Sequence, residues 1–323
     1  MLQDTTGRGI GYLRLSLTKA CSMRCTYCRP TWLEQPRGEP VLTPQELEQI
    51  ARHLARHHGL RKVRLTGGDP TSRPELVEII RRIASIEGID DLAMTTNGLT
   101  LVRMAQQYAD AGLKRINLSM DSLDPDRFAR MTGVNGLARV LEGIDAAHAA
   151  GLGPIKINAV VLRGENDQEL PDLVRFAAKR GVVIRFIELM PMGPLASSWA
   201  ERYVPEQAMR DAIAPIVRDM QPLEQGHDAA RRYRMTLDDG STAEVGFITP
   251  MSCNFCAQCN RMRITANGEL YPCLMDEPRG SLLDAVRPVF DGHAVDQAIQ
   301  NSLEQKQAEH PHDGFVTMTH IGG

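Results

Sequence analysis

The sequence predicts an α/β protein that consists of a partial, TIM-like barrel of six parallel strands followed by an α+β extension. Three observations support this prediction. Short apolar runs alternate with amphipathic helical patterns through the first 190 residues. The alternation gives six strand–helix units, too few for a closed eightfold barrel. Beyond about residue 191 the alternation stops, and turn signals typical of hairpins replace it.

The expected strands of the barrel are short and are separated by helical patterns. They are Tyr12–Leu17, Val63–Leu65, Asp91–Thr95, Arg115–Ser119, Ile155–Leu162 and Val182–Ile187. The first expected helix begins with Thr43, Pro44 and Glu46, a capping-box pattern, and ends at Gly59. The other helices are Pro74–Ile83, Leu101–Ala111, Leu137–Ala150 and Gln168–Lys179. Helical crossovers between successive strands imply a parallel sheet.

The remainder of the chain predicts a smaller unit that closes the barrel. We expect helices at Glu206–Ile216 and Val295–Glu309, with hairpins that turn at Asp238-Asp239-Gly240 and at Asn267-Gly268. The expected division is a barrel over residues 1–190, an extension over 191–310 and a tail over 311–323 that ends in Gly-Gly.

Composition sets broad limits on function. A formal net charge of −3 argues against a wholly basic nucleic-acid binder. The N-terminus shows no signal-peptide pattern, and no apolar run approaches the ~18 residues of a membrane span. A cytoplasmic location without membrane association is therefore the expectation.

The seven cysteines lie in two groups. Three occupy positions 21, 25 and 28, and four occupy positions 253, 256, 259 and 273. An odd number of clustered cysteines without a secretory signal indicates metal ligation rather than disulfides.

The first group follows the first strand directly. Cys21, Cys25 and Cys28 can ligate three irons of a [4Fe–4S] cube and leave one iron open for a substrate. A zinc site or buried free thiols are the alternatives. Zinc usually takes four closed ligands, and no fourth Cys or His is near in the sequence.

The second group leaves its ligand set open. Spacing alone permits any three, or all four, of Cys253, Cys256, Cys259 and Cys273. Four ligands would make a ferredoxin-like electron-transfer cluster, and three would leave another open iron. If Cys253 is not a ligand, we expect it to be a small buried residue.

Basic residues on the predicted strands indicate an anion site. Arg14, Lys62, Arg64, Lys156 and Arg185 lie on or beside four of them. Charges inside apolar strands are costly unless they are paired or face a ligand, so together they predict a cationic funnel inside the barrel. Arg261 and Arg263, two apart in a predicted strand, would share one side of it beside the second cysteine group.

Two motifs resemble the radical S-adenosylmethionine (SAM) superfamily. Cys21-x3-Cys25-x-Tyr27-Cys28 matches the superfamily signature, and Thr66-Gly67-Gly68-Asp69-Pro70 matches its SAM-binding glycine motif, with Asp69 in place of the usual Glu. The resemblance implies that SAM binds the open iron of the first cluster. It also agrees with the partial barrel.

The C-terminal motif is similar to that of the GTP 3′,8-cyclases of molybdenum cofactor biosynthesis. The similar residues run from Phe255 through Thr265 and Gly268 to Pro272, Cys273 and Leu274, and the tail His320-Ile321-Gly322-Gly323 matches as well. The resemblance extends from Gly11 to Gly323. It implies a second [4Fe–4S] cluster on Cys256, Cys259 and Cys273, without Cys253.

The same resemblance implies roles for individual residues. Those matching SAM contacts are Tyr27, Gly68, Ser119 and Met190. Those matching GTP contacts or neighbouring basic positions are Arg14, Lys62, Arg64, Thr95, Lys156, Arg185, Arg261, Met262 and Arg263. Arg14, Arg261, Arg263, Gly322 and Gly323 are the expected catalytic residues, with the glycines reaching into the active site.

The implied reaction is radical cyclisation of GTP. A 5′-deoxyadenosyl radical from SAM abstracts the 3′ hydrogen of GTP, and the carbon radical attacks C8 of guanine. The product is 3′,8-cyclo-7,8-dihydro-GTP, the first intermediate on the way to molybdopterin. The expected partners are a flavodoxin- or ferredoxin-like electron donor and the downstream cyclic pyranopterin monophosphate synthase, and a homodimer is compatible with the sequence.

Two other hypotheses fit the cysteine spacing. A different two-cluster radical SAM enzyme, such as a peptide-modifying one, predicts four-cysteine ligation of the second cluster and no GTP binding. A non-catalytic Fe–S electron-transfer protein predicts no SAM cleavage. A further pattern, His53 and His57 four apart on a helix, resembles a zinc pair, but without a third ligand nearby a solvated helix face is the expectation.

Overall fold

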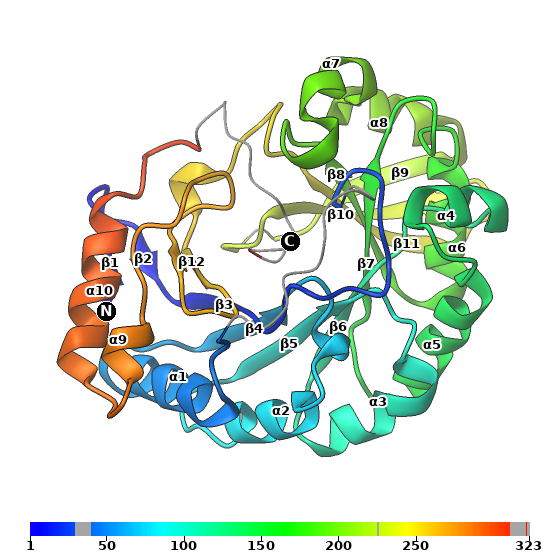
Figure 1. Cartoon of the computed structure of the whole chain (residues 1–323). Coiled ribbons are helices and arrows are strands. Elements are labelled where there is room, and N and C mark those ends of the chain that lie inside the picture. Colours follow the sequence, from blue (N-terminus) through cyan, green and yellow to red (C-terminus); the bar gives the residue numbers. More distant parts are fainter. Residues whose placement is uncertain (30–39, 225, 311–320, 322–323) are drawn as a thin grey trace.

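The computed structural model describes residues 1–29, 40–224, 226–310 and 321. All six expected strands are present, as neighbours in one parallel sheet that curves around a central space (Figure 1). They are β3 (Tyr12–Ser16), β4 (Lys62–Thr66), β5 (Asp91–Thr96), β6 (Arg115–Ser119), β7 (Lys156–Val161) and β8 (Val183–Glu188). The predicted six-stranded partial barrel is confirmed.

The helices cover the outer, convex side of this sheet (Figure 1). They are α1 (Pro44–His58), α2 (Leu76–Ala84), α3 (Leu101–Asp110), α5 (Leu137–Ala149) and α6 (Leu170–Arg180), each within a few residues of its predicted bounds. The capping box of α1 is formed. Thr43 accepts from the amide of Glu46, Glu46 accepts from the amide of Thr43, and Gly59 ends the helix at φ 69°.

Helix α4 (Pro125–Thr132), between β6 and α5, was not predicted. Its signals are present in the sequence. Asp124 accepts from the amide of Arg127, Pro125 occupies the first turn, and Gly133 ends the helix in the left-handed conformation.

Two further parallel strands extend the sheet beyond the six. β12 (Arg261–Ile264) pairs with β3 at one edge, and β11 (Thr242–Ile248) pairs with β8 at the other. Both predicted hairpins are confirmed, since β10 (Ala230–Leu237) pairs with β11 and β13 (Leu270–Tyr271) with β12. With β9 (Val217–Pro222), the sheet has eleven strands in the order β13-β12-β3-β4-β5-β6-β7-β8-β11-β10-β9.

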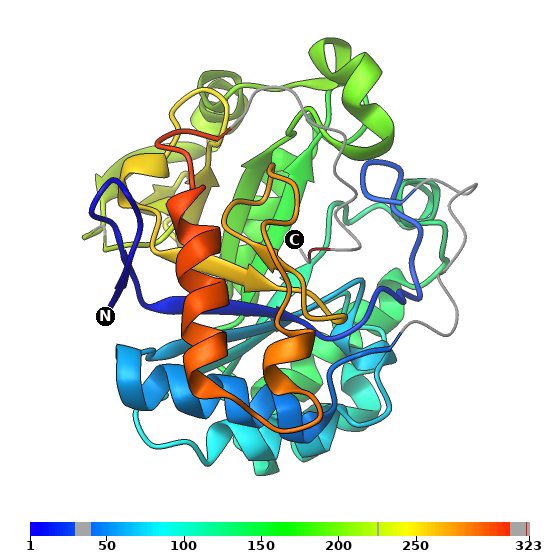
Figure 2. The same ribbon diagram turned by 60° about the vertical axis from the view of Figure 1, so that its left-hand side comes forward.

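Smaller elements complete the described chain. β1 (Leu2–Gln3) and β2 (Gly9–Ile10) form a two-stranded sheet. Helices α7 (Trp199–Arg202) and α8 (Glu206–Ile213) follow β8, and α9 (Leu283–Val286) and α10 (Gly292–Glu304) follow β13. In Figure 2, α10 stands in front of β12 and reaches down to α1. Among the described residues, no helix is both long and apolar enough to cross a membrane.

Strand alternation separates an apolar exterior of the sheet from a charged interior. In β3, Leu13 and Leu15 are fully buried against the outer helices, and Arg14 between them points into the barrel pocket. β12 repeats the pattern, because Arg261 and Arg263 face the pocket and Met262 packs into the core, 1% exposed.

Met262 is therefore placed as a core residue, with its side chain directed away from the predicted GTP site. We expect Met262→Ala to lower the free energy of unfolding by about 2–5 kcal/mol, because it leaves a cavity between β12 and its helices. Denaturant unfolding measures this loss. The control Met220→Ala, at a side chain 39% exposed, should change stability by less than about 0.5 kcal/mol. Equal effects would contradict the core placement.

Candidate active site

The first cysteine group lies in the loop after β3. Cys25 and Cys28 pack beside Tyr27 and Leu189, so the loop contacts the end of β8 across the barrel. Burial, reinforced by Cys21, raises the pKa of Cys28 to about 12. A thiolate at this position therefore needs a cationic partner, which iron would provide.

The number of thiols in this loop favours a cube over a single ion. Structural zinc usually takes four protein ligands, whereas Cys21, Cys25 and Cys28 offer three. Among the described residues, the trio of ligand atoms that could hold a single metal ion contains no cysteine. Three thiolates can ligate three irons of a [4Fe–4S] cube and leave the fourth iron open.

The glycine motif holds this loop in place. The amide of Gly68 donates to the carbonyl of Thr18 at 2.7 Å, and the amide of Asp69 donates to that of Ala20 at 2.8 Å. A side chain at Gly68 would collide with the carbonyl oxygen of Ala20. The glycine therefore permits close contact between this backbone and the cysteine loop.

Asp69 is a buried structural carboxylate. It accepts from the amides of Thr71 (2.8 Å) and Asn97 (2.6 Å) and from the hydroxyl of Thr96 (2.9 Å), so it joins the ends of β4 and β5. Asn97 in turn donates to Ser22 Oγ at 3.0 Å and to Cys21 Sγ at 3.8 Å. The shorter acid thus supports the first cysteine group through Asn97.

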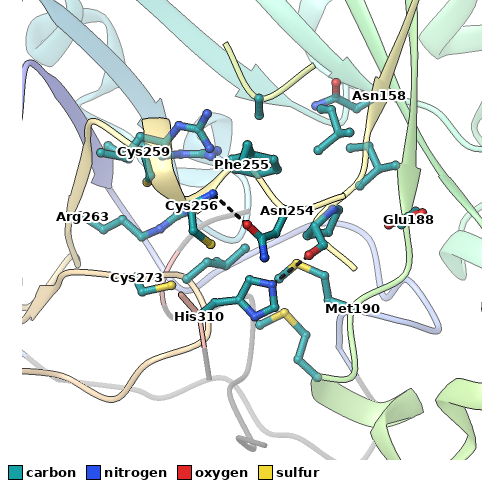
Figure 3. A pocket seen from close by; sticks show the side chains of 18 of the residues that line it. Asn158, Glu188, Met190, Asn254, Phe255, Cys256, Cys259, Arg263, Cys273 and His310 are labelled. Carbon is teal, nitrogen blue, oxygen red and sulfur yellow. Dashed lines mark hydrogen bonds between the residues drawn. The ribbon is translucent and has the colours of Figure 1, made fainter. Parts of the chain in front are cut away.

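Three cysteines of the second group lie in the barrel pocket, and the fourth lies outside it. Cys256, Cys259 and Cys273 line the barrel pocket together (Figure 3). Cys253 is exposed and does not line the pocket, and Arg231 Nη1 donates to its sulfur at 2.7 Å. This placement favours the three-residue ligand set. The expectation that Cys253 is buried was wrong, because the loop turns it outward toward β10.

Lys306, just after α10, connects the segments that carry these cysteines. Lys306 is 4% exposed, and its ammonium donates to the carbonyl of Arg261 at 2.9 Å, to the carbonyl of Pro272 and to Cys259 Sγ at 3.8 Å. Burial alone would raise the pKa of Cys259, but Lys306 and Arg261 lower it below its ordinary value. Sequence reasoning missed Lys306, since a lysine after a polar helix looks like a surface residue.

Arginines from the neighbouring strands β12, β3 and β4, together with one from β8, form a wall of the pocket. Strand register places Arg14 between Arg263 and Arg64, and Arg185 and Arg261 line the same space. Burial and Arg64 lower the pKa of Arg185 to about 9, and burial and Arg261 lower that of Arg263 to about 10. Buried like charges that depress one another's pKa values favour an anionic ligand.

Orphaned polar atoms support this inference. Within the part of the chain that the structure describes, the buried Nε atoms of Arg64, Arg185 and Arg261 have no hydrogen-bond partner. Buried donors normally have one, so a ligand with several acceptor oxygens would complete the site.

Lys62 and Lys156, also predicted for the substrate site, do not line the pocket. Lys62 Nζ contacts Asp228 at 3.4 Å, and burial and Arg185 lower the pKa of Lys156 to about 8. Burial would raise the pKa of Asp228, but Lys62, Lys156 and Arg185 lower it to about 2. Asp228 therefore carries the compensating negative charge in the pocket. Its position in a loop before β10 gave no signal in the sequence.

Three of the four predicted SAM contacts lie at or just past the end of a strand, and Tyr27 lies in the cysteine loop. Tyr27 and Met190 line the pocket. Gly68 lies two residues after the end of β4, and Ser119 is the last residue of β6. Thr95, predicted to contact GTP, also lines the pocket. Figure 3 shows Met190 on the side of the pocket opposite Cys259 and Cys273. The structure thus brings two of the predicted SAM contacts and the three cysteines of the second group around one cavity, whereas Cys21, Cys25 and Cys28 lie outside its lining.

Glu188 at the end of β8 is a third residue that sequence reasoning missed. Its carboxylate accepts from the amides of Glu206, Met251 and Ser252, each at 3.0 Å. It thereby fixes the loop before the second cysteine group to the strand that leads to Met190. An acid as the last residue of a buried strand was the available signal.

The predicted catalytic glycines, Gly322 and Gly323, lie outside the described residues. Their neighbour Ile321 is fully buried against Met192 and Tyr271, with Met190 and Leu274 packed beside them. Met190, Met192 and Leu274 also line the pocket. Ile321 is therefore close to the site.

We expect Gly68→Ala to lower the free energy of unfolding by about 1–3 kcal/mol, because the added methyl displaces the backbone of the cysteine loop. Thermal unfolding of the purified protein tests this. Gly11→Ala is the matched control, since no atom would lie within 4 Å of its new methyl. An unchanged stability for Gly68→Ala would contradict the tight packing of these two segments.

Comparison with known proteins agrees with this geometry. Residues 15–177 match the family model of the radical SAM superfamily, and residues 182–312 match that of molybdenum cofactor synthesis C. The GTP 3′,8-cyclase of Pelotomaculum thermopropionicum is 45% identical over 90% of this chain and 88% of its own length. GTP 3′,8-cyclase 1 of Pseudomonas aeruginosa is 43% identical over 95% of this chain and 93% of its own length.

Solved structures show the same fold at low identity. Streptococcus suis SuiB bound to the precursor peptide SuiA superposes with a TM-score of 0.61 at 14% identity, covering 95% of this chain and 76% of that one. SuiB bound to S-adenosylmethionine gives 0.59 at 16%, covering 89% and 68%. On the evidence of the two family models and these relatives, the chain belongs to the radical SAM superfamily and, within it, to the family of the GTP 3′,8-cyclases.

Proposed function

We propose that this chain converts GTP to 3′,8-cyclo-7,8-dihydro-GTP. One observation carries the proposal: a single pocket is lined by three cysteines of the second group, by a wall of arginines and by Tyr27 and Met190 from the SAM side. A nucleoside triphosphate needs converging cations, and the arginine wall supplies them. The relatives' printed names agree with this substrate.

The cysteines fit two [4Fe–4S] clusters, with SAM bound at the first. Cys21, Cys25 and Cys28 would hold the first cluster, and Cys256, Cys259 and Cys273 the second, which would bind guanine at its open iron. When bound, the first cluster and SAM supply the 5′-deoxyadenosyl radical that removes the 3′ hydrogen of GTP. Tyr27, Gly68, Ser119 and Met190 are the proposed SAM contacts.

The protein's own part is to bind, orient and shield. Arg64, Lys62, Lys156 and Arg185 would hold the triphosphate, and Thr95 would contact the nucleotide within the same wall. Arg14, Arg261 and Arg263 lie nearest the second cysteine group in the strand register, where they would stabilise charge that develops on the purine. Any contact from Met262 would use its backbone, since its side chain is buried in the core.

The tail and the partners complete the proposal. Burial of Ile321 beside Met190 and Leu274 supports a role for Gly322 and Gly323 in the active site. Reduction of the first cluster requires a one-electron donor of flavodoxin or ferredoxin type. The product would pass to the cyclic pyranopterin monophosphate synthase.

An anaerobic assay with variants of two cysteines tests the function. The reconstituted protein with dithionite, SAM and GTP should form 5′-deoxyadenosine and a cyclised GTP isomer, detected by mass spectrometry. Cys259→Ser should lose at least 100-fold of the cyclised product while retaining SAM cleavage, since it removes a ligand of the second cluster only. The matched variant Cys253→Ser should retain cyclisation, because Cys253 lies outside the pocket.

Other outcomes separate the alternatives. Cleavage of SAM without consumption of GTP would point to a different substrate for the same radical chemistry. Cyclisation that survives Cys259→Ser would contradict the proposed second cluster, and its loss in Cys253→Ser would favour four-cysteine ligation.

A second prediction concerns Lys306. We expect Lys306→Met to lower the iron content from about eight toward about four per chain, because it removes the buried ammonium that joins the two segments of the second group. Iron analysis and electron paramagnetic resonance of the reduced protein measure the loss. Lys114→Met, at an exposed lysine, is the control. Full iron content in Lys306→Met would contradict the inference that Lys306 stabilises the second cysteine group.

A further inference from the structure

Two histidines and an aspartate converge outside the barrel pocket. His53 and His58 near the end of α1 both direct Nε2 at the same oxygen, Oδ1 of Asp296 on α10, at 2.8 and 2.7 Å. The three ligand atoms all lie within 4.8 Å of one another. None of these residues lines the active-site pocket, so the cluster has no part in the proposed reaction.

This cluster corrects the expectation for the helix face. The sequence pairs His53 with His57 and shows no third ligand nearby. In the structure, the side chains of His53 and His58 are only 12% and 19% exposed, and α10 supplies the third ligand from 238 residues away. His57 is exposed and lies outside the trio.

The surroundings hold the His53 imidazole in this position. The ring of Phe290 packs against it at 5.7 Å between centroids. Gly292 at the start of α10 leaves it room, since a Cβ there would lie 2.7 Å from its Cε1. Burial would raise the pKa of Asp296, but the hydrogen bonds from both imidazoles lower it, so the carboxylate is ionised at neutral pH.

The donor set suits a borderline divalent metal. In tetrahedral geometry, metal–nitrogen and metal–oxygen bonds of about 2.0–2.2 Å place neighbouring ligand atoms about 3.3–3.6 Å apart. The two nitrogens lie 2.8 and 2.7 Å from the carboxylate oxygen, and all three ligand atoms lie within 4.8 Å of one another. Side-chain shifts of about 1 Å would therefore bring the three atoms to the spacing of metal ligands. The metal would bind the unprotonated Nε2 of each imidazole, and the proton displaced from each Nε2 would pass to Nδ1 of the same ring or to solvent. Imidazole nitrogen with one carboxylate favours Zn²⁺ and similar ions over Mg²⁺ or Ca²⁺.

We propose that His53, His58 and Asp296 bind one divalent transition-metal ion of the Zn²⁺ class, with the fourth position open to water. The ion would clamp the first helix of the barrel to α10, which Figure 2 shows reaching α1 at its lower end. α10 leads directly to Lys306, whose ammonium joins the segments of the second cysteine group. The clamp would therefore fix the element that supports that group. It stands independently of the substrate assigned above.

Zinc binding to the cluster-loaded protein tests the proposal. The reconstituted protein is titrated anaerobically with ZnCl₂ at micromolar concentration and desalted, and zinc and iron are measured by mass spectrometry. We expect about one zinc per chain, unchanged iron, and a melting temperature raised by a few degrees. His58→Gln and Asp296→Asn should each lower zinc affinity at least 10-fold. His57→Gln, adjacent and exposed, should retain it.

X-ray absorption at the zinc edge distinguishes this site from the cysteines. Nitrogen and oxygen ligands at about 2.0–2.2 Å without sulfur would support the proposal. A sulfur shell at about 2.3 Å would place the zinc on the thiols and overturn it. Absence of binding, or binding unaffected by both His58→Gln and Asp296→Asn, would show that the trio is only a hydrogen-bonded contact between α1 and α10. If either His58→Gln or Asp296→Asn fails to fold, the other variant still tests the site.

Discussion

The parallel pairing of β12 with β3 is the interaction on which the site depends. It joins a strand near the C-terminus to the first strand of the barrel and sets Arg263 beside Arg14 in register. Because Cys259 lies two residues before β12, the same pairing brings the second cysteine group to the barrel interior. The first group follows β3 at its other end. One strand pair therefore determines where the two groups face one another.

The charged interior is stable because its cations are distributed and partly compensated. The arginines of β3, β4, β8 and β12 lower one another's pKa values, and Asp228 in the same pocket carries an opposite charge. Burial of so many cations without matching carboxylates costs stability unless a ligand supplies the missing charge. The buried arginines therefore lower the stability of the empty protein but hold cations in place for a polyanion. Binding of the polyanion then supplies free energy that orients the substrate.

Buried polar side chains connect the loops that hold the two cysteine groups. Asp69 joins the ends of β4 and β5 and reaches the first cysteine group through Asn97. Glu188 fixes the loop before the second group, and Lys306 joins its two segments. Loops are otherwise the most variable part of a fold, and satisfied buried polar groups hold them within the narrow tolerance that a radical reaction needs. The proposed clamp at His53, His58 and Asp296 extends the same logic to α10.

Local patterns in the sequence determined the elements: the six strands, their crossover helices, the capping box at Thr43 and the turns at Gly240 and Gly268 follow from periodicity and turn chemistry. Cysteine spacing and motif resemblance identified the two groups. Only the tertiary structure decided that β11 and β12 dock on opposite edges of the barrel sheet, that Cys253 turns outward, and that Asp228, Glu188, Lys306 and Asp296 meet partners far away in the chain. Pairings across hundreds of residues depend on which exposed edges and unsatisfied groups meet in the folded molecule, and no local pattern encodes that meeting.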